Sequence, residues 1–462
     1  MLDLVIRDGT LVTASETIQA DLGIQNGRVA AIGQSLQGKE VLSARGMLVV
    51  PGAIDTHVHL EMATPVTVSS DDWHTGTIAA AHGGTTTIVD FVETEPGQTL
   101  LEALKQRQAQ AEGQAVIDYG LHMTLAQVDA ETLAEVPKVL EEGVSSFKVY
   151  TVYEGLRLDD YDMIQALQAV ARHGGMVIAH SENDAMVKGA TRQLLQAGKT
   201  GPESHPLSRP AIAEGEAIER MLTLAEYTHT PILIVHISTR RGAEAVARAR
   251  RRGQVAFGET CPQYLLLEDS AYSRPNFEGA KFVCSPPLRK ATDNRFLWKA
   301  LAAGSLQTVG TDHCPFFFVG QKELGREDFT KIPGGIPGIE ARFALLYTFG
   351  VGAGIISLNR WVEVCCTDPA RIFGMYPRKG TLAPGADADL VLFDPQRRVS
   401  LTAGFLHENV DYTPYEGLEL QGYPVLTMLR GQVLVREGEF VGPQGGGQFL
   451  KRNAQNGKTN RS

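Results

Sequence analysis

The feature that most constrains the fold of this chain is an alternation of apolar strands with helix-length segments, which runs from Pro51 to about residue 313. Strands that alternate with helices form a parallel sheet, and eight such strands favour a closed (β/α)8 barrel. The alternative is a doubly wound open sheet, but the sequence lacks the glycine fingerprint that usually follows the first strand of that fold. The predicted strands are Pro51–His59, Thr85–Phe91, Asp118–Thr124, Ser145–Thr151, Met176–His180, Pro231–Ser238, Gln254–Thr260 and Gln307–His313. The amphipathic segments between them include Leu100–Gln110, Asp160–Arg172, Ala211–Tyr227 and Gly242–Arg252.

Both ends of the chain have a different sequence pattern, with short β-favouring runs separated by turn residues. Within residues 2–50, Asn26-Gly27 between two apolar runs predicts a hairpin. Runs of the same kind return after about residue 367. The predicted strands are Leu2–Ile6, Leu11-Val12, Ala20–Gln25, Arg28–Ile32, Met47–Val50, Ala388–Phe393, Val425–Leu429 and Gln432–Val435.

These two sequence patterns, together with the composition of the C-terminal residues, predict that the chain has three parts. Residues 1–50 and 368–442 together form one small β-sandwich, and the barrel of residues 51–367 is inserted into it. Residues 443–462 are rich in Gly, Gln and Asn, and we expect them to form a mobile tail, or a contact with a neighbouring subunit through Phe449-Leu450.

The composition is that of an ordinary globular protein, with 43% hydrophobic and 21% charged residues. The net charge of −10, without a basic cluster before the tail, disfavours nucleic acid or a membrane as a partner. Five cysteines without a Cys-x-x-Cys pair suit free thiols in a reducing compartment. Because the sequence shows neither a signal peptide nor an apolar run long enough to cross a bilayer, we expect a cytoplasmic enzyme.

Two histidines come at the end of the first barrel strand, in Asp55-Thr56-His57-Val58-His59. Residues two apart in an extended chain point to the same face, so the imidazoles of His57 and His59 aim at one point. Neutral imidazole is a common ligand of zinc and related divalent metals. Because a lone His-x-His also occurs at turns without a metal, the interpretation depends on ligands at other strand ends.

Further candidate ligands do lie at the ends of other strands. They are Lys148 on the fourth strand, His180 on the fifth, His236 on the sixth and Asp312 on the eighth. In barrels of this type the active site lies at the C-terminal strand ends. Each residue alone could be structural, as a buried histidine or a turn-capping aspartate. Four of the twelve histidines at one end of one barrel predict a metal centre, and imidazole with carboxylate suits zinc, manganese, iron or cobalt.

Lys148 is the unusual member of this set. A lysine among cations should lose its proton, because repulsion and desolvation lower the pKa of its amine. A neutral amine reacts with carbon dioxide to give a carbamate, an anion with two oxygens that can bridge two metals. We therefore interpret Lys148 as a site of carboxylation, giving N6-carboxylysine.

Several motifs resemble those of the cyclic amidohydrolases of the amidohydrolase superfamily, and specifically of the dihydropyrimidinase/D-hydantoinase family in its phenylhydantoinase-like branch. The resemblance extends over essentially the whole chain. The segments that carry it are Pro51–Leu60, Thr75–Thr77, Gly83–Thr86, Ser146–Lys148, Ala179–Asn183, Glu259–Leu265, Ser285–Arg289, Thr311–Cys314 and Asp411–Gly417.

The resemblance implies a (β/α)8 barrel with a β-sandwich and two divalent metal ions per subunit, zinc in the first place and manganese as the alternative. It implies that His57, His59 and Asp312 hold one ion and that His180 and His236 hold the other, with carboxylated Lys148 shared. It also implies that Tyr153 donates a hydrogen bond to the developing oxyanion. A core aromatic on a loop is the alternative, but the position of Tyr153 five residues after Lys148 favours the functional role. Ser285 matches the residue whose backbone binds the amide edge of the substrate.

One position departs from the family pattern. Lys331-Ile332-Pro333 is followed by Gly334, where the family usually has Asn. Because relatives make this substrate contact largely through the main chain, glycine at position 334 need not abolish binding. It is expected to loosen the loop and alter the fit of the substrate.

The function implied by the resemblance is hydrolytic opening of cyclic amides, with Asp312 as general base and then general acid. The substrates would be 5-substituted hydantoins or dihydropyrimidines, and the products N-carbamoyl amino acids. The loops after strands one, two and four carry Met62, Val66, Val68, Val92, Tyr153 and Leu156. This apolar set favours an apolar or aromatic 5-substituent.

Three related functions are alternatives. Dihydroorotases tend to carry Arg two residues after the second histidine, whereas position 61 is Glu here. Allantoinase shares the metal ligands and remains open as an alternative. The collapsin-response-mediator branch, a non-catalytic scaffold of the same fold, has lost ligands that this chain keeps. Relatives are commonly tetramers, so we expect a homo-oligomer, tetramer or dimer.

Overall fold

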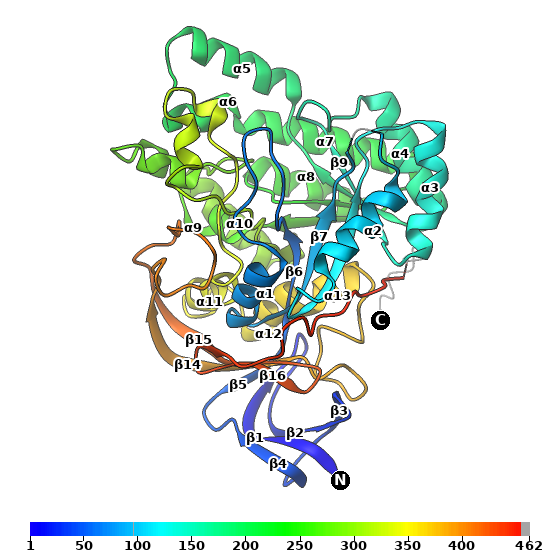
Figure 1. Cartoon of the computed structure of the whole chain (residues 1–462), viewed down its shortest axis with the longest axis vertical. Helices are drawn as coiled ribbons and strands as arrows, with labels where there is room; N and C mark the ends of the chain where they lie inside the picture. Colours follow the sequence, from blue (N-terminus) through cyan, green and yellow to red (C-terminus); the bar gives the residue numbers. More distant parts are fainter. Residues whose placement is uncertain (96, 454–462) are drawn as a thin grey trace.

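The computed structural model describes residues 1–95 and 97–453, and it divides into a barrel and a sheet built from both chain ends (Figure 1). Eight parallel strands form the barrel in the order β13-β12-β11-β10-β9-β8-β7-β6. Their bounds are β6 Ala53–Val58, β7 Thr85–Val92, β8 Asp118–Thr124, β9 Ser146–Tyr150, β10 Met176–His180, β11 Ile232–Ile234, β12 Ala256–Thr260 and β13 Thr308–Val309. The first and last strands are joined by a bridge between Val58 and His313, which closes the barrel. The predicted (β/α)8 barrel is confirmed.

Helices follow the barrel strands and surround them (Figure 1). They are α1 Trp73–His82, α2 Leu100–Ala111, α3 Ala130–Glu141, α4 Asp160–Arg172, α5 Asp184–Gln196, α6 His205–Ser208, α7 Ala211–Thr228, α8 Arg240–Arg251, α9 Pro262–Leu266, α10 Ala291–Ala302, α11 Arg342–Leu346, α12 Leu358–Val362 and α13 Asp368–Ile372. Capping residues in the sequence mark where some of these helices begin. Asp72 and Thr99 each form a capping box with the residue three positions later, which satisfies free N–H groups of α1 and α2.

Two barrel strands are much shorter than the sequence predicts. β11 ends at Ile234 and β13 at Val309, so His236 and Asp312 lie in the loops that follow. Both residues have a positive φ, 39° for His236 and 55° for Asp312. A non-glycine residue in this left-handed region costs about 1–3 kcal/mol, and such residues concentrate at functional sites. The backbone therefore turns out of the strand in order to aim these two side chains.

The second part is a nine-stranded mixed sheet in which both ends of the chain pair, as predicted. Its strands are β1 Leu2–Val12, β2 Thr17–Gln25, β3 Arg28–Gly33, β4 Gly38–Ser43, β5 Leu48–Pro51, β14 Leu390–Ser400, β15 Glu419–Leu429, β16 Gln432–Arg436 and β17 Glu439–Phe440. β5 joins the two halves, because it pairs with β1 on one side and with β14 on the other. β4 was not predicted, since all of its side chains are exposed or only half-buried and it lacks the alternation that marks a strand.

The sheet lies at the end of the barrel where β6 begins, opposite the ends that carry His57 and His180 (Figure 1). Buried side chains fill separate cores in the barrel and in the sheet. This arrangement leaves the C-terminal strand ends free for a site.

The segment just before residue 454 is packed, in contrast to the mobile tail that its composition predicts. Phe449 bridges to Tyr119 of β8, and Leu450 is 3% exposed in a core cluster of the barrel. The Arg452 guanidinium is buried and donates to Ser146 Oγ. Phe449 and Leu450 therefore contact their own barrel, and the remainder of the predicted tail, residues 454–462, lies outside the described residues.

Among the helices within residues 1–95 and 97–453, the structure has none that is both long enough and apolar enough to cross a membrane.

Candidate active site

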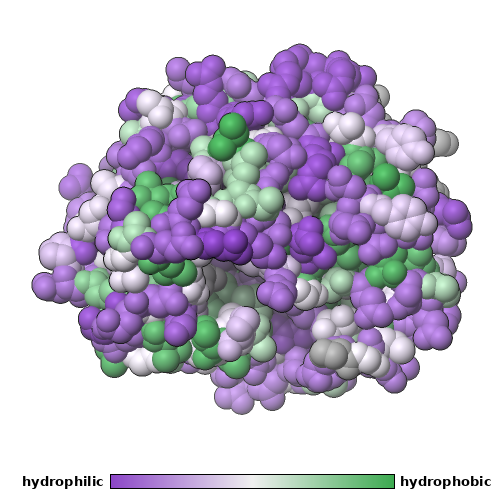
Figure 2. Space-filling view, turned by 90° about the horizontal axis from the view of Figure 1, so that it is seen from above, coloured by the Kyte–Doolittle hydropathy of each residue, from purple (hydrophilic) through white to green (hydrophobic). Residues whose placement is uncertain are grey.

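One cavity at the C-terminal end of the barrel collects all the predicted metal ligands, Tyr153 and the two predicted backbone-binding residues. Its volume is about 520 Å³. The predicted residues that line it are His57, His59, Lys148, Tyr153, His180, His236, Ser285, Asp312 and Gly334. Figure 2 looks onto this end of the molecule, which is hollowed near its middle and carries small hydrophobic groups among hydrophilic residues.

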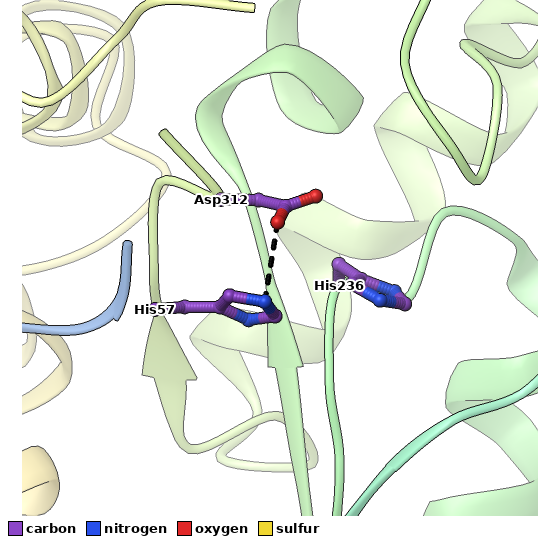
Figure 3. Close-up of side chains that lie close together, drawn as sticks. All are labelled: His57, His236 and Asp312. Carbon is purple, nitrogen blue, oxygen red and sulfur yellow. Dashed lines mark ion pairs between the residues drawn. The ribbon is translucent and has the colours of Figure 1, made fainter. Parts of the chain in front are cut away.

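The Asp312 carboxylate is the centre of the cluster. Its Oδ1 lies 3.1 Å from His57 Nε2 and 3.2 Å from His59 Nε2. Ligand atoms of His57, His236 and Asp312 all lie within 4.8 Å of one another, and Figure 3 shows the three side chains converging. Four ligands about 2.1 Å from a zinc ion in a tetrahedron lie about 3.4 Å from each other. The spacing around Asp312 therefore fits a metal centre.

Unsatisfied nitrogens support the same interpretation. His236 Nδ1 is buried and has no hydrogen-bond partner within the described residues, and His57 Nε2 faces only the Asp312 carboxylate, 3.1 Å away. A buried polar atom without a partner is costly, unless a ligand that is not part of the chain satisfies it. The imidazole and carboxylate donors, together with the unpartnered nitrogen of His236, thus fit a divalent cation.

Two buried glutamates orient the histidine rings from behind. Glu259 Oε1 lies 2.7 Å from His57 Nδ1, and Glu182 Oε2 lies 2.8 Å from His180 Nε2. Each contact leaves the other ring nitrogen free, Nε2 in His57 and Nδ1 in His180. A carboxylate behind a histidine fixes its tautomer and raises its basicity, as is usual for metal-ligating histidines.

The protonation of the histidines in the cluster depends on their burial and on the carboxylates near them. Burial opposes protonation of His57, but the carboxylates of Asp312 and Glu259 outweigh it and raise the pKa of His57 to about 9. Burial lowers the pKa of both His180 and His236, which keeps these imidazoles neutral. A cation bound between His57 and Asp312 would take the place of the His57 proton, since metal and proton compete for one lone pair.

Lys148 lies inside the barrel wall with 1% of its surface exposed. Burial lowers the pKa of its amine to about 8, against the opposing effect of Asp312. Its Nζ lies 5.0 Å from the ring of Phe91 and 5.1 Å from that of Tyr150, and it forms no ion pair within residues 1–95 and 97–453. An amine in this environment is largely neutral above pH 8, which is the form that reacts with carbon dioxide.

Tyr153 reaches the cavity from a strained position, with φ at +81°. Its ring centroid is 5.0 Å from that of His180, and the Arg209 guanidinium carbon lies 5.2 Å from the Tyr153 ring. Burial raises the pKa of the Tyr153 hydroxyl to about 12. The hydroxyl therefore keeps its proton and can donate a hydrogen bond into the cavity.

The predicted apolar lining is only partly found. Met62, Val66 and Leu156 line the cavity with Tyr153, and Phe329 and Ile332 extend its apolar wall. The remaining two predicted residues do not line it. Val92 is buried inside the barrel, and Val68 points to solvent with 48% of its surface exposed.

Among the described residues, two other groups of side chains that could hold a metal lie outside this cavity. Asp118, Asp387 and Asp389 already surround an ammonium, because Lys379 Nζ lies 2.5–3.1 Å from all three. His82 and His407 lie near Glu340 with their rings stacked 3.4 Å apart and 13° from parallel. Lone pairs lie in the ring plane, so parallel stacked rings cannot both point at one ion.

Sequence reasoning assigned no role to Glu182, Arg209 or Glu259. Arg209 Nη1 lies 2.5 Å from Glu182 Oε2, and Arg209 outweighs burial to lower the pKa of Glu182 to about 2. Glu182 and Glu259 lie close to candidate ligands in the sequence or at a strand end, which could have marked them. Arg209 lies in the turn after α6, where no pattern distinguishes it.

Comparisons with known proteins agree with this geometry. The chain matches the model of the "Amidohydrolase family" over residues 48–434. It is 47% identical to a "D-hydantoinase" of Geobacillus stearothermophilus, over 97% of this chain and 96% of that protein. It is 40% identical to a "D-phenylhydantoinase" of Escherichia coli O7:K1, over 97% and 98%. The solved dihydropyrimidinase of Brevibacillus agri NCHU1002 superposes with a TM-score of 0.97 at 45% identity, over 98% of this chain and 99% of that one.

Proposed function

Because this chain belongs to the amidohydrolase family, within its D-hydantoinase and dihydropyrimidinase group, we propose that it hydrolyses the ring of 5-substituted hydantoins or dihydropyrimidines. The ring C–N bond is broken by water, and the products are N-carbamoyl α- or β-amino acids. The observation that carries the proposal is the convergence of His57, His59 and His236 on the Asp312 carboxylate in one cavity.

The proposal includes two divalent metal ions, zinc in the first place and manganese as the alternative. His57, His59 and Asp312 would hold one ion and His180 and His236 the other, with Lys148 shared as N6-carboxylysine. When bound, such a pair acts as a Lewis acid and supplies hydroxide near neutral pH. The unpartnered nitrogen of His236 and the approach of His57 and His59 to Asp312 support this assignment.

Asp312 moves the proton in this proposal. His57 outweighs the effect of burial and holds the pKa of the Asp312 carboxyl well below its usual range, so the group is a carboxylate before reaction. It accepts the proton of the attacking water and gives it to the ring nitrogen as the C–N bond breaks.

Tyr153 stabilises the charge that develops on the ring carbonyl. Its protonated hydroxyl donates a hydrogen bond to the oxyanion, which is a stronger interaction in the transition state than in the ground state. The strained φ at Tyr153 supports a functional role for this side chain.

The backbone of Ser285 and Gly334 binds the amide edge of the ring. These residues face each other, because a Cβ on Gly334 would lie 3.6 Å from Ser285 Oγ. Within the described residues, the main-chain groups of both have no hydrogen-bond partner, which leaves them available to a ligand. The apolar wall around Met62, Leu156 and Ile332 supports an apolar or aromatic 5-substituent.

A homo-oligomer, tetramer or dimer, is also part of the proposal. Met186 on α5, Leu207 on α6 and Ile212 on α7 are 38%, 55% and 52% exposed, and these apolar side chains support an association surface. Light scattering of the purified protein would give the number of subunits.

Ultraviolet assays of ring opening on dihydrouracil, 5-phenylhydantoin and allantoin test the proposed reaction. We expect 5-phenylhydantoin to give the highest kcat/KM. A preference for allantoin would replace the proposal with an allantoinase. Failure to open any of the three after incubation with zinc or manganese and bicarbonate would favour a non-catalytic scaffold.

A further inference from the structure

Lys322 is a fully buried lysine that is not balanced by a carboxylate. It lies in the short helical turn Lys322–Gly325, and none of its surface is exposed. It forms no ion pair within the part of the chain that the structure describes. Instead its ammonium donates to three main-chain carbonyls, those of Val283 at 2.9 Å, Pro333 at 2.7 Å and Gly335 at 2.7 Å.

These three carbonyls belong to the two segments that carry Ser285 and Gly334. Gly335 also donates its N–H to the Val283 carbonyl at 3.0 Å, so the segments are joined both directly and through Lys322. For the carbonyls of Pro333 and Gly335, Lys322 is the sole hydrogen-bond donor among the described residues. Burial lowers the pKa of Lys322 to about 7, and its ammonium form, which alone has three N–H groups for the three carbonyls, holds these acceptors by charge-assisted hydrogen bonds.

Other buried side chains hold the remaining carbonyls around Ser285. His205 Nε2 lies 2.8 Å from the Cys284 carbonyl, and the Tyr264 hydroxyl donates to the Pro286 carbonyl at 2.6 Å. Between these fixed neighbours, the main-chain groups of Ser285 and Gly334 have no hydrogen-bond partner in the part of the chain that the structure describes. Each free group is thus flanked by peptide units that cannot turn, which is the arrangement expected of a preorganised binding edge.

We propose that Lys322 is a positioning residue, which fixes the Ser285 and Gly334 segments at the separation that the amide edge of a cyclic substrate requires. Lys322 does not line the cavity, so it acts through the backbone and not by contact with the substrate. Because Gly334 supplies no side chain to limit the motion of its loop, this chain depends on the Lys322 contacts for the geometry there. The identity of the ligand rests on the proposed function, but the positioning of the two segments does not.

Lys322→Met tests the inference, because methionine has a similar length and no donor. Lys322→Gln keeps one donating group, and Lys331→Met is the matched control, since Lys331 is exposed nine residues away on the same loop. Each variant is measured for metal content, for KM and kcat on 5-phenylhydantoin, and for hydrogen exchange in peptides that cover residues 283–289 and 331–340.

For Lys322→Met we expect KM to rise about tenfold or more, kcat to change less than about threefold, and metal content to stay at the wild-type level. Exchange should rise in both peptides and in no other part of the cavity wall. Lys322→Gln should fall between wild type and Lys322→Met, and it carries the test if Lys322→Met does not fold. Lys331→Met should match wild type throughout.

Unchanged KM and unchanged exchange in Lys322→Met would overturn the inference. A fall in kcat at constant KM would overturn it as well, since that result would place Lys322 in the chemical step. If the wild type opens none of the ring substrates, the proposed function has failed, and the exchange measurement still decides whether Lys322 fixes the two segments.

Discussion

His57 and Asp312 meet twice across the seam at which the barrel closes. The Asp312 N–H donates to the His57 carbonyl at 2.9 Å, and Asp312 Oδ1 lies 3.1 Å from His57 Nε2. His57 belongs to β6, the first strand of the barrel, and Asp312 follows β13, the last strand. The cluster is therefore complete only when the barrel is closed. The contacts that assemble the site therefore also close the barrel.

Metal removal should consequently lower stability. Anything that binds the closed barrel and not the unfolded chain stabilises it, by about 4 kcal/mol when free metal exceeds the dissociation constant a thousandfold. We expect the melting temperature, measured by calorimetry, to fall by several degrees after dialysis against a chelator and to recover with zinc. Equal melting temperatures with and without metal would show that metal binding does not stabilise the closed barrel.

Glu259→Gln should weaken the metal centre without disrupting the cavity. The variant loses the carboxylate behind His57 Nδ1 while it keeps nearly the same volume. Removal of such a partner typically costs about 10–100-fold in metal affinity. Competition with a chromophoric chelator measures this loss, with Glu226→Gln on the exposed end of α7 as the control. An unchanged affinity would show that Glu259 does not orient His57.

Tyr153→Phe should lower kcat by about 10²–10³ with little change in KM, because it removes one donor to the oxyanion. Tyr161→Phe, at a position 73% exposed, is the control. The pH profile gives a second check. The pKa of Tyr153 is raised to about 12, so its hydroxyl keeps its proton through pH 10 and should not cause a fall in kcat between pH 9 and pH 10. Full activity in Tyr153→Phe would remove this residue from the mechanism.

Carboxylation of Lys148 should depend on pH in the metal-free protein. The amine has a pKa of about 8, lowered by burial, and only its neutral form reacts. At constant dissolved carbon dioxide, the rate of reactivation by zinc should rise about tenfold per pH unit below pH 8 and level off above it. A rate that is independent of both pH and carbon dioxide would argue that Lys148 enters the site unmodified.

The sequence predicted the residues of the site better than the geometry that aims them. His57 lies in β6 and His59 directly follows it, and period-two alternation predicts both on one face, although the pairing of β6 with β7 is irregular between Asp55 and Val58. His236 and Asp312 were placed inside strands that actually end two and three residues earlier, because positive φ has no signature in a non-glycine residue.

Contacts that involve main-chain groups could not be predicted from the sequence. Lys322 binds carbonyls from segments distant in sequence, and carbonyls leave no mark in side-chain patterns. The glycines and amides around Phe449 and Leu450 predict a tail because they resemble a linker, although Leu450 is buried.

Metal content per chain, measured by mass spectrometry beside ring opening of 5-phenylhydantoin, tests the central claim most directly. The wild type should carry about two zinc or manganese ions per chain and open the ring. Lys148→Ala should carry at most about one and lose at least about 10³-fold in kcat/KM, while Lys188→Ala, 56% exposed on α5, should match the wild type. Two metals and full activity in Lys148→Ala would contradict the proposed role of Lys148 in holding two metal ions.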